Sequence, residues 1–198
     1  MKVILTDIDD TVLRFAYAFE KWAVEHKGYT LYRSIRDGCK TIEEALGCTE
    51  DDVDSLVNEF STNPTFFGSI PPESDALAVV PVLHRMGYQF VGVSSCVDGP
   101  EVTTCRRKNL EEAFGFKWLN VHCVGLLASK DEILRSYSAS WWVEDNHRNA
   151  VLGDSLGHKT FLLDRPYNRK TIEPPHNVSI VDSWHDVFDA IVRSERHE

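Results

Sequence analysis

Acidic side chains follow the first apolar segment of the sequence. Asp7, Asp9 and Asp10 come directly after residues 2–6, whose apolar pattern predicts a β-strand. Carboxylates two residues apart at a strand end can converge on one point, where a bound cation or a proton relieves their repulsion. Both outcomes suit phosphoryl transfer. Asp7 could attack phosphorus to give an aspartyl-phosphate, and Asp9 could then exchange protons with the leaving group and with water, worth about 10²–10⁴-fold in rate. A solvated acidic turn is the alternative interpretation.

Hydroxyl and ammonium groups follow other predicted elements. Ser94 and Ser95 come after an apolar run at 88–93, where a hydroxyl could donate to a phosphoryl oxygen. Lys130 follows a turn of small residues at the start of a predicted helix, where it could neutralise a phosphoryl group. Taken singly, the serines are ordinary loop residues and the lysine an ordinary surface residue.

A second pair of acids ends the apolar run at 141–143. Glu144 and Asp145 are hard oxygen donors of the kind that Mg²⁺ prefers. We expect Asp145 to be a ligand and Glu144 to orient a metal-bound water, although these two roles could be reversed. Asn149 lies one helical turn after Asp145 and is expected to support it.

The elements that must position these groups alternate between strands and helices. The apolar runs predict five strands, at 2–6, 88–93, 119–124, 140–143 and 159–163. Such runs suit strands that are covered on both faces, so we predict an α/β fold with a mainly parallel sheet. The predicted helices run from an N-cap at Ser74 to Met86 with a break or kink at Pro81, from Pro100 to Gly115, and from Ser183 to Val192.

The segment between the first two strands breaks this alternation. Residues 14–70 are predicted to be wholly helical, with a helix over 15–27 and two capping-box-like starts, at Thr41 with Glu44 and at Thr49 with Asp52. An insertion at this point would lie over the carboxyl ends of the strands, where open α/β sheets bind ligands. We interpret it as a cap.

The order of acid-x-acid, hydroxyl, lysine and acid pair resembles the haloacid dehalogenase superfamily of phosphatases. The resemblance implies a Rossmann-like parallel sheet flanked by helices, with a core at 1–14 and 70–198 and a type 1 helical cap at 15–69. It also implies an Mg²⁺-dependent phosphomonoester hydrolase with Asp7 as nucleophile and Asp9 as acid and base. The other implied site residues are Ser94 and Lys130, and the implied metal ligands are Asp7, the backbone carbonyl of Asp9, Asp145 and Glu144.

A narrower resemblance is to the 5'(3')-deoxyribonucleotidases and their phage-encoded relatives. It depends on Phe66-Phe67 before Ile70-Pro71-Pro72, on the serine pair, and on the run from Glu144 to Asn149. It implies a (deoxy)nucleoside monophosphate as substrate. The residues that we expect to contact the substrate are Thr11, Ser95, Phe15 and Phe19. Helical spacing on the cap favours a core position for both phenylalanines, and stacking on a base is the alternative. Asp10 stands where that group commonly has glycine, and Ser94 where threonine is usual.

Several other functions are compatible with the same residues. The chain could act on another small phosphometabolite or on nucleic-acid ends, or it could bind phosphate without turnover. A dehalogenase would not need Asp9, because a halide leaves without a proton. A signalling receiver domain would carry its phosphoacceptor on a later strand. The net charge of -10 makes extended nucleic-acid binding unexpected and favours a small phosphorylated substrate.

The remaining features indicate an ordinary globular protein. The five cysteines are odd in number and form no Cys-x-x-Cys pair, which indicates free thiols in a reducing compartment. No apolar run is long enough for a signal peptide or a membrane span, so we expect a cytoplasmic protein without membrane contact. The segment Arg106-Arg107-Lys108 is interpreted as a solvated helix face.

Overall fold

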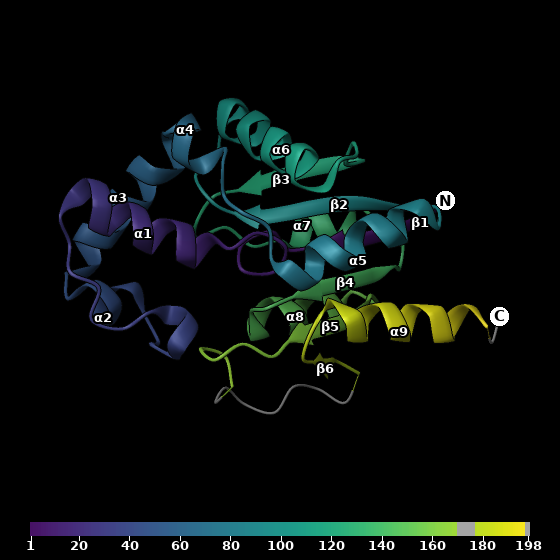
Figure 1. The fold of residues 1–198 in the computed structure, drawn as a ribbon. Coiled ribbons are helices and arrows are strands. Elements are labelled where there is room, and N and C mark those ends of the chain that lie inside the picture. The colour runs from purple at the N-terminus through teal and green to yellow at the C-terminus, as the bar shows by residue number, and fades with distance from the viewer. Residues whose placement is uncertain (170–176, 197–198) are drawn as a thin grey trace.

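Six parallel strands form one sheet in the computed structural model, which describes residues 1–169 and 177–196 (Figure 1). In chain order the strands are β1 (Lys2–Thr6), β2 (Tyr88–Ser95), β3 (Asn120–Val124), β4 (Trp141–Glu144), β5 (Lys159–Leu163) and β6 (Ser179–Val181). Their order across the sheet is β3-β2-β1-β4-β5-β6. Because β1 lies between β2 and β4, the residues that follow β1 emerge at the centre of one sheet edge.

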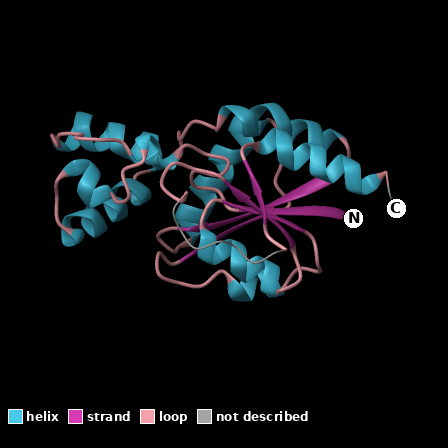
Figure 2. Ribbon diagram, turned by 90° about the horizontal axis from the view of Figure 1, so that it is seen from below, coloured by secondary structure: helices cyan, strands magenta, loops and turns pink. Residues whose placement is uncertain are grey.

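Helices cover both faces of this sheet (Figure 2). They are α5 (Ser74–Arg85), α6 (Pro100–Phe114), α7 (Asp131–Arg135), α8 (His147–Ser155) and α9 (Trp184–Glu195). On one face α5 packs against α6 and α9, and on the other α7 packs against α8. The fold is therefore the predicted α/β Rossmann-like arrangement, a parallel sheet flanked by helices.

Alternation along the strands explains why both faces are apolar. Successive residues of a strand point to opposite sides, so Ile4 packs in one buried cluster and Leu5 in another. The first cluster includes Phe90 and Leu83 from the α5 side of the sheet, and the second includes Trp142. The near-continuous apolar runs in the sequence follow from this double coverage.

A group of helices lies beyond the carboxyl ends of the strands, between β1 and β2 in sequence (Figure 1). It comprises α1 (Phe15–Lys27), the 3₁₀ helix η1 (Ile35–Asp37), α2 (Ile42–Leu46), α3 (Glu50–Thr62) and α4 (Pro64–Phe67). Its position is the one expected of the helical insertion, and its interior is aromatic, with Phe19, Trp22 and Phe60 in mutual ring contact. The division of the chain into a core and a cap stays a prediction.

The capping signals within the insertion are confirmed. The Thr41 hydroxyl accepts a hydrogen bond of 3.2 Å from the Glu44 N–H at the start of α2. Thr49 and Asp52 form a capping box in which each side chain accepts from the other residue's backbone N–H. These contacts satisfy N–H groups that the first helical turn leaves without partners.

Two local predictions were wrong, and one short strand was not predicted. The insertion is not helical throughout, because residues 28–34 between α1 and η1 form no helix. Ser74 is the first helical residue of α5 rather than its N-cap, which is Glu73. The helix continues through Pro81, so there is no break there, and the alternative prediction of a kink stays a prediction. The short strand β6 was not predicted, because three residues after a polar stretch carry too little apolar periodicity.

The buried residue His158 leads to a prediction about pH. Its Nε2–H donates to the Leu134 carbonyl at 3.2 Å, and its Nδ1 accepts from the Ser140 N–H at 3.3 Å. This pairing requires neutral imidazole, and burial lowers the pKa of His158 below its ordinary value of about 6.5. At His158 the folded state thus binds fewer protons than the unfolded state in this range. The contribution of His158 to stability is therefore complete above about pH 6.5 and declines as the pH falls below it.

Urea denaturation between roughly pH 5 and roughly pH 8 measures this decline. His158→Gln should flatten the slope between these limits, because glutamine can donate and accept without titrating. The exposed His185 provides the matched control, and His185→Gln should leave the slope as it is in the unchanged protein. An identical slope in the His158 variant would contradict the assignment.

Candidate active site

The carboxyl ends of β1 and β4 lie side by side at the centre of the sheet edge. Thr6 pairs with Val143, and the Asp7 N–H donates a hydrogen bond of 2.8 Å to the Val143 carbonyl. This register places Asp7, the residue after β1, next to Glu144 and Asp145 at the end of β4. Acids from two distant parts of the sequence therefore meet at one point.

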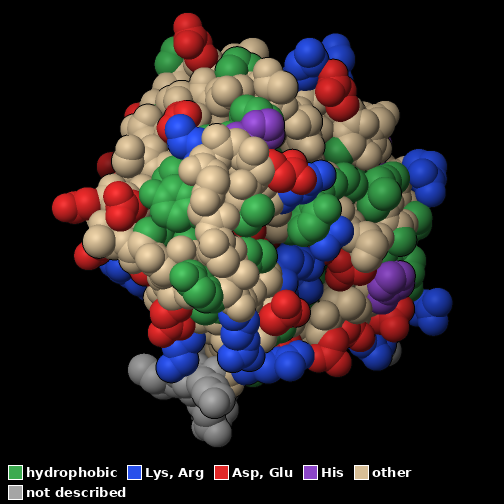
Figure 3. All heavy atoms as spheres, turned by 60° about the vertical axis from the view of Figure 1, so that its left-hand side comes forward, with side chains coloured by type: hydrophobic (Ala, Val, Ile, Leu, Met, Phe, Trp, Pro, Cys, Tyr) green, Lys and Arg blue, Asp and Glu red, His purple; other side chains and the backbone are tan. Residues whose placement is uncertain are grey.

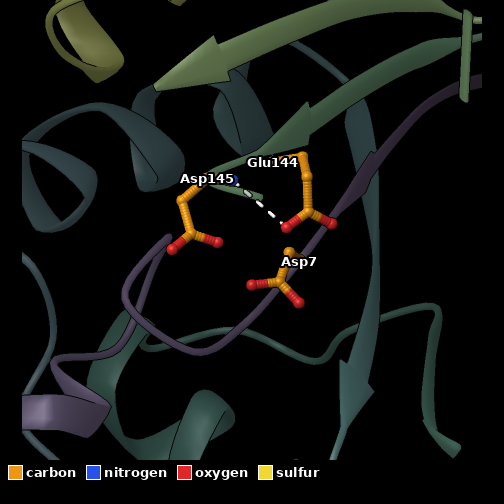
Figure 4. A group of neighbouring side chains, drawn as sticks. All are labelled: Asp7, Glu144 and Asp145. Carbon is orange, nitrogen blue, oxygen red and sulfur yellow. Dashed lines mark hydrogen bonds between the residues drawn. The ribbon is translucent and has the colours of Figure 1, made fainter. Parts of the chain in front are cut away.

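Asp7, Glu144 and Asp145 form a group of three carboxylates (Figure 4). One oxygen from each residue lies within 4.8 Å of the others. Asp7 and Glu144 are buried, and only 8% of Asp145 is exposed. Buried hard oxygen donors at this spacing fit a divalent cation such as Mg²⁺, because the cation offsets the repulsion between them.

Lys130 reaches this group from the residue that precedes α7. It is almost completely buried, and its Nζ donates to Asp7 Oδ1 and, at 2.9 Å, to Glu144 Oε2. Burial alone would lower the pKa of Lys130, but the two carboxylates raise it above its ordinary value. The ammonium is therefore held in its charged form beside the predicted nucleophile.

Thr11 joins Asp7 to Asp145 through its buried hydroxyl. The Oγ1 atom lies 3.1 Å from Asp7 Oδ2 and 3.2 Å from Asp145 Oδ1. A hydroxyl has one proton to donate, so it bonds to one carboxylate at a time and keeps both in place. The structure thus gives Thr11 contacts to the two acids.

The pKa shifts of Asp7 and Glu144 reflect burial first and charge second. Burial raises the pKa of Asp7 to about 6, with Lys130 opposing the shift and Asp145 adding to it. Burial also raises the pKa of Glu144 well above its ordinary range, and the charge of Asp7 adds to this effect. One lysine therefore does not neutralise the group, and positive charge from a cation would complete it.

Asp9 also follows β1, but its carboxylate lies near the carboxyl end of β2, whereas Glu144 and Asp145 are at the end of β4. Its Oδ2 accepts a hydrogen bond of 2.6 Å from the Ser94 hydroxyl, and its Oδ1 accepts one of 2.7 Å from the Arg106 guanidinium. Ser94 is thus brought into the site. Ser95 follows it in the strand, so the two side chains point to opposite faces of the sheet, and the structure does not gather Ser95 with Asp9.

The interpretation of residues 106–108 as a solvated helix face was wrong for Arg106, which is completely buried. A signal was present in the sequence, because the buried residues of α6 recur at helical spacing. They are Val102, Arg106, Asn109, Leu110 and Phe114. The arginine lies on that apolar face, whereas Lys108 is exposed.

The expected support of Asp145 by Asn149 was also wrong. Among the described residues, no hydrogen bond joins Asn149 to Asp145, whose side chain and carbonyl are bonded by Thr11, Tyr167 and Asn168. Asp145 is instead bonded by the segment after β5. The Tyr167 hydroxyl donates to Asp145 Oδ2, and Asn168 Nδ2 donates to the Asp145 carbonyl at 2.6 Å.

The backbone at Asp10, where the deoxyribonucleotidases commonly have glycine, has the conformation that favours glycine. Its backbone is left-handed, with φ of 55°, a conformation that aspartate adopts more readily than most residues. Its carboxylate accepts from the Ala16 N–H at 3.1 Å, which caps the start of α1. It also lies 3.4 Å from Arg36 of η1, whose guanidinium donates to Glu73 at 3.0 Å.

The two phenylalanines predicted to contact substrate lie in the aromatic interior of the insertion. Their rings stack at 5.8 Å, and each meets Phe60 edge to face. Phe19 has no exposed surface, so its ring is not available to a nucleobase in this structure. Phe15 is only partly buried.

Solved structures share this fold across nearly the whole chain. A D,D-heptose 1,7-bisphosphate phosphatase from B. bronchiseptica, complexed with magnesium and phosphate, is 12% identical with a TM-score of 0.62, and the match covers 98% of this chain and 99% of that one. An L-2-haloacid dehalogenase is 15% identical with a TM-score of 0.60, covering 96% and 98%. A putative beta-phosphoglucomutase from Thermotoga maritima is 12% identical with a TM-score of 0.56, covering 98% and 99%.

These structures belong to the haloacid dehalogenase superfamily. The chain has the fold of that superfamily. No protein-family model and no curated protein matches its sequence. Sequence identity at this level shows the fold, so the activity has to be argued from the residues of the site. The likeness to deoxyribonucleotidases and the type of cap stay predictions.

Proposed function

We propose that the chain is a magnesium-dependent phosphomonoester hydrolase that uses Asp7 as its nucleophile. The observation that carries this proposal is the position of Asp7. Its carboxylate accepts a hydrogen bond from the Lys130 ammonium and lies beside the acids Glu144 and Asp145, at the carboxyl edge of the sheet. An anionic substrate can approach Asp7 only when positive charge is present on both sides of this carboxylate. Lys130 supplies it on one side, and a bound cation would supply it on the other.

The proposed reaction has two steps. An Asp7 oxygen bonds to phosphorus while the bond from phosphorus to the leaving oxygen breaks, and Asp9 gives that oxygen a proton. Asp9 then takes a proton from water as the water oxygen bonds to phosphorus, which releases phosphate and restores Asp7. Lys130 stabilises the negative charge on the phosphoryl oxygens, and we expect the Ser94 hydroxyl to donate to one of them when a substrate is bound.

The residues present fit a magnesium ion. Asp7, Asp145 and the Asp9 backbone carbonyl would hold it, and bound there it would offset phosphoryl charge. Glu144 is the weaker candidate for a direct ligand, because Lys130 occupies its Oε2 and the backbone N–H groups of Asp145 and Asn146 donate to its Oε1. The heptose bisphosphate phosphatase with the same fold, complexed with magnesium and phosphate, supports this choice of cation.

Asp9 favours phosphoester hydrolysis over dehalogenation. Halide leaves as a stable anion, whereas an alkoxide needs a proton as it departs. In this chain the Asp9 carboxylate is fixed near Asp7 by two hydrogen bonds, from Ser94 and Arg106. A side chain without a role in the reaction would not need to be fixed in this way. A 2-haloacid therefore belongs in the assay as the competing substrate class.

We further propose a small phosphorylated substrate, with a (deoxy)nucleoside monophosphate as the first candidate. On the face that carries the insertion, basic and acidic side chains are interspersed, which does not suit a long nucleic acid (Figure 3). In the described part of the chain, no helix combines the length and the apolarity that crossing a bilayer requires.

A substrate screen with Mg²⁺ tests the proposal by measuring released phosphate. It should include nucleoside monophosphates, sugar phosphates, a 5'-phosphorylated oligonucleotide and a 2-haloacid. We expect phosphate release from at least one small monoester and no halide release. Halide release without phosphate release would overturn the proposal. Turnover of sugar phosphates but not of nucleotides would overturn only the choice of substrate.

Removal of the metal site has a predicted effect. Asp145→Asn should raise the Mg²⁺ concentration needed for half-maximal activity by about tenfold or more, because a carboxylate ligand is lost. A chelator should silence the unchanged enzyme. Activity titrated against Mg²⁺ measures both effects, and the partly exposed Asp131, paired with Arg135, provides the control Asp131→Asn. An unchanged Mg²⁺ requirement in the Asp145 variant would count against its role as a ligand.

A further inference from the structure

Arg106 is a buried cation whose main charged partner is a predicted catalytic group. It lies on α6 with no exposed surface, and its ion pair is with Asp9 at 2.7 Å. Its Nε and NH1 atoms are buried and have no hydrogen-bond partner among the described residues. A buried guanidinium that forms hydrogen bonds through only one of its three nitrogens destabilises a fold, because the other two have lost their bonds to water. Packing alone would be served better by an apolar side chain.

The guanidinium is fixed on two sides. Its NH2 donates to Asp9, and its central carbon lies 3.8 Å from the centre of the Phe67 ring. Phe67 belongs to α4, is fully buried, and meets Phe60 of α3 edge to face at 6.2 Å. A planar group stacked on a ring and aimed by one hydrogen bond has little freedom to rotate.

The two oxygens of Asp9 consequently differ. Arg106 occupies Oδ1, and a guanidinium N–H can only donate, so a proton on Oδ1 would oppose it. Ser94 occupies Oδ2, and its hydroxyl can either donate or accept. Oδ2 is therefore the oxygen that can carry a proton without losing its partner, and it has a second lone pair free for a substrate.

We propose that Arg106 is the positioning residue for Asp9, fixing Oδ1 so that Oδ2 exchanges protons with the leaving group and with water. This inference depends on the proposed phosphomonoester hydrolysis. In the first step the proton moves from Oδ2 to the leaving oxygen as the phosphorus–oxygen bond breaks. In the second, Oδ2 takes a proton from the attacking water.

Leaving groups of different basicity test this role. Because kcat/KM reports events up to the first irreversible step, it isolates leaving-group departure from hydrolysis of the aspartyl-phosphate. Arg106→Met should lower kcat/KM for an alkyl phosphomonoester by about 10–100-fold. For p-nitrophenyl phosphate, whose nitrophenolate leaves without a proton, the loss should stay within about threefold. Arg107→Met is the matched control, since Arg107 lies on the same helix but bonds Trp118 and Asn120.

A double-mutant cycle with Asp9→Asn separates positioning from a structural role. If Arg106 acts through Asp9, Arg106→Met should cause no further loss of kcat/KM for the alkyl ester in the Asp9→Asn background. Arg106→Lys keeps the charge but loses the planar stack, and should show the same dependence on leaving group. Thermal unfolding of each variant identifies any that fails to fold, in which case the lysine variant decides.

The possible failures are distinct. Equal losses for both esters, or additive losses with Asp9→Asn, would overturn the role of Arg106 and leave the proposed function standing. Absence of phosphate release from both esters by the unchanged protein would overturn the proposed function itself.

Discussion

Asparagine in place of Asp7 is expected to lower kcat for phosphate release by at least about 10⁴-fold while leaving the fold intact. The amide has nearly the same shape as the carboxylate but cannot form the aspartyl-phosphate. Lys130 keeps Glu144 as a partner at 2.9 Å, so no buried charge is left alone. Released phosphate measures the loss, with Asp131→Asn again as the control for a change from aspartate to asparagine on the surface.

The same variant should be at least as stable as the unchanged protein without metal. Burial raises the pKa of Asp7 to about 6, so the folded state binds more protons than the unfolded state above the ordinary value of 3.8. The contribution of Asp7 to the stability of the unchanged protein therefore falls as the pH rises from about 4 to about 6, and Asp7→Asn should remove that contribution. Hydrolysis of a chromogenic phosphate ester at the unchanged rate would refute the nucleophile assignment.

The sheet and the acids at its edge could be predicted from the sequence because one physical pattern encodes both. An apolar run that leads directly into acids, as before Asp7 and before Glu144 and Asp145, marks a buried strand with polar groups at its carboxyl end. Parallel strands share that end, so both acids were expected at one edge of the sheet. Their contact depends on β4 lying next to β1, which the sequence did not predict. Lys130 was expected at the same edge, since it precedes a helix that returns along the sheet.

Other parts of the site depend on tertiary packing that no local pattern reports. Tyr167 reaches Asp145 only because the segment after β5 turns back across the sheet edge. Arg106 stands in a run of three basic residues, and composition favours solvent for such a run. Helical spacing from Val102 to Leu110 places it on the apolar face. Only the packing of α6 in the folded protein, against β3 and α5, shows that this face meets Asp9.

The acids of the site differ in whether a buried cation is paired with them. Arg106 serves Asp9 and Lys130 serves Asp7 and Glu144, so each predicted catalytic acid has its own buried cation. Asp145 has instead a hydroxyl from Thr11 and one from Tyr167. Asp145, the acid without an ammonium or guanidinium partner, is therefore the one best placed to bind a metal ion. For this reason the loss of Asp145 and the loss of Lys130 should have different consequences.

Lys130→Met should reduce both activity and stability. Removing a cation that stabilises developing phosphoryl charge is expected to lower kcat by about 10²–10³-fold. The change also leaves Asp7 and Glu144 buried without the ammonium, and breaking a buried ion pair on one side destabilises by about 3–5 kcal/mol. Urea denaturation without metal measures the second effect, and released phosphate measures the first.

The sign of the pH dependence identifies the cause of that instability. Burial already holds the pKa of Glu144 well above its ordinary range, and losing Lys130 raises it further, so the folded variant binds protons that the unfolded chain releases. Its stability deficit should therefore be small at roughly pH 5 and large at roughly pH 8. Adding Glu144→Gln removes one stranded carboxylate and should restore part of the stability without restoring activity, because the phosphoryl group still lacks its ammonium. A deficit that is equal at both pH values, or that the second change leaves untouched, would mean that Lys130 stabilises the fold by packing against Trp142 rather than by charge.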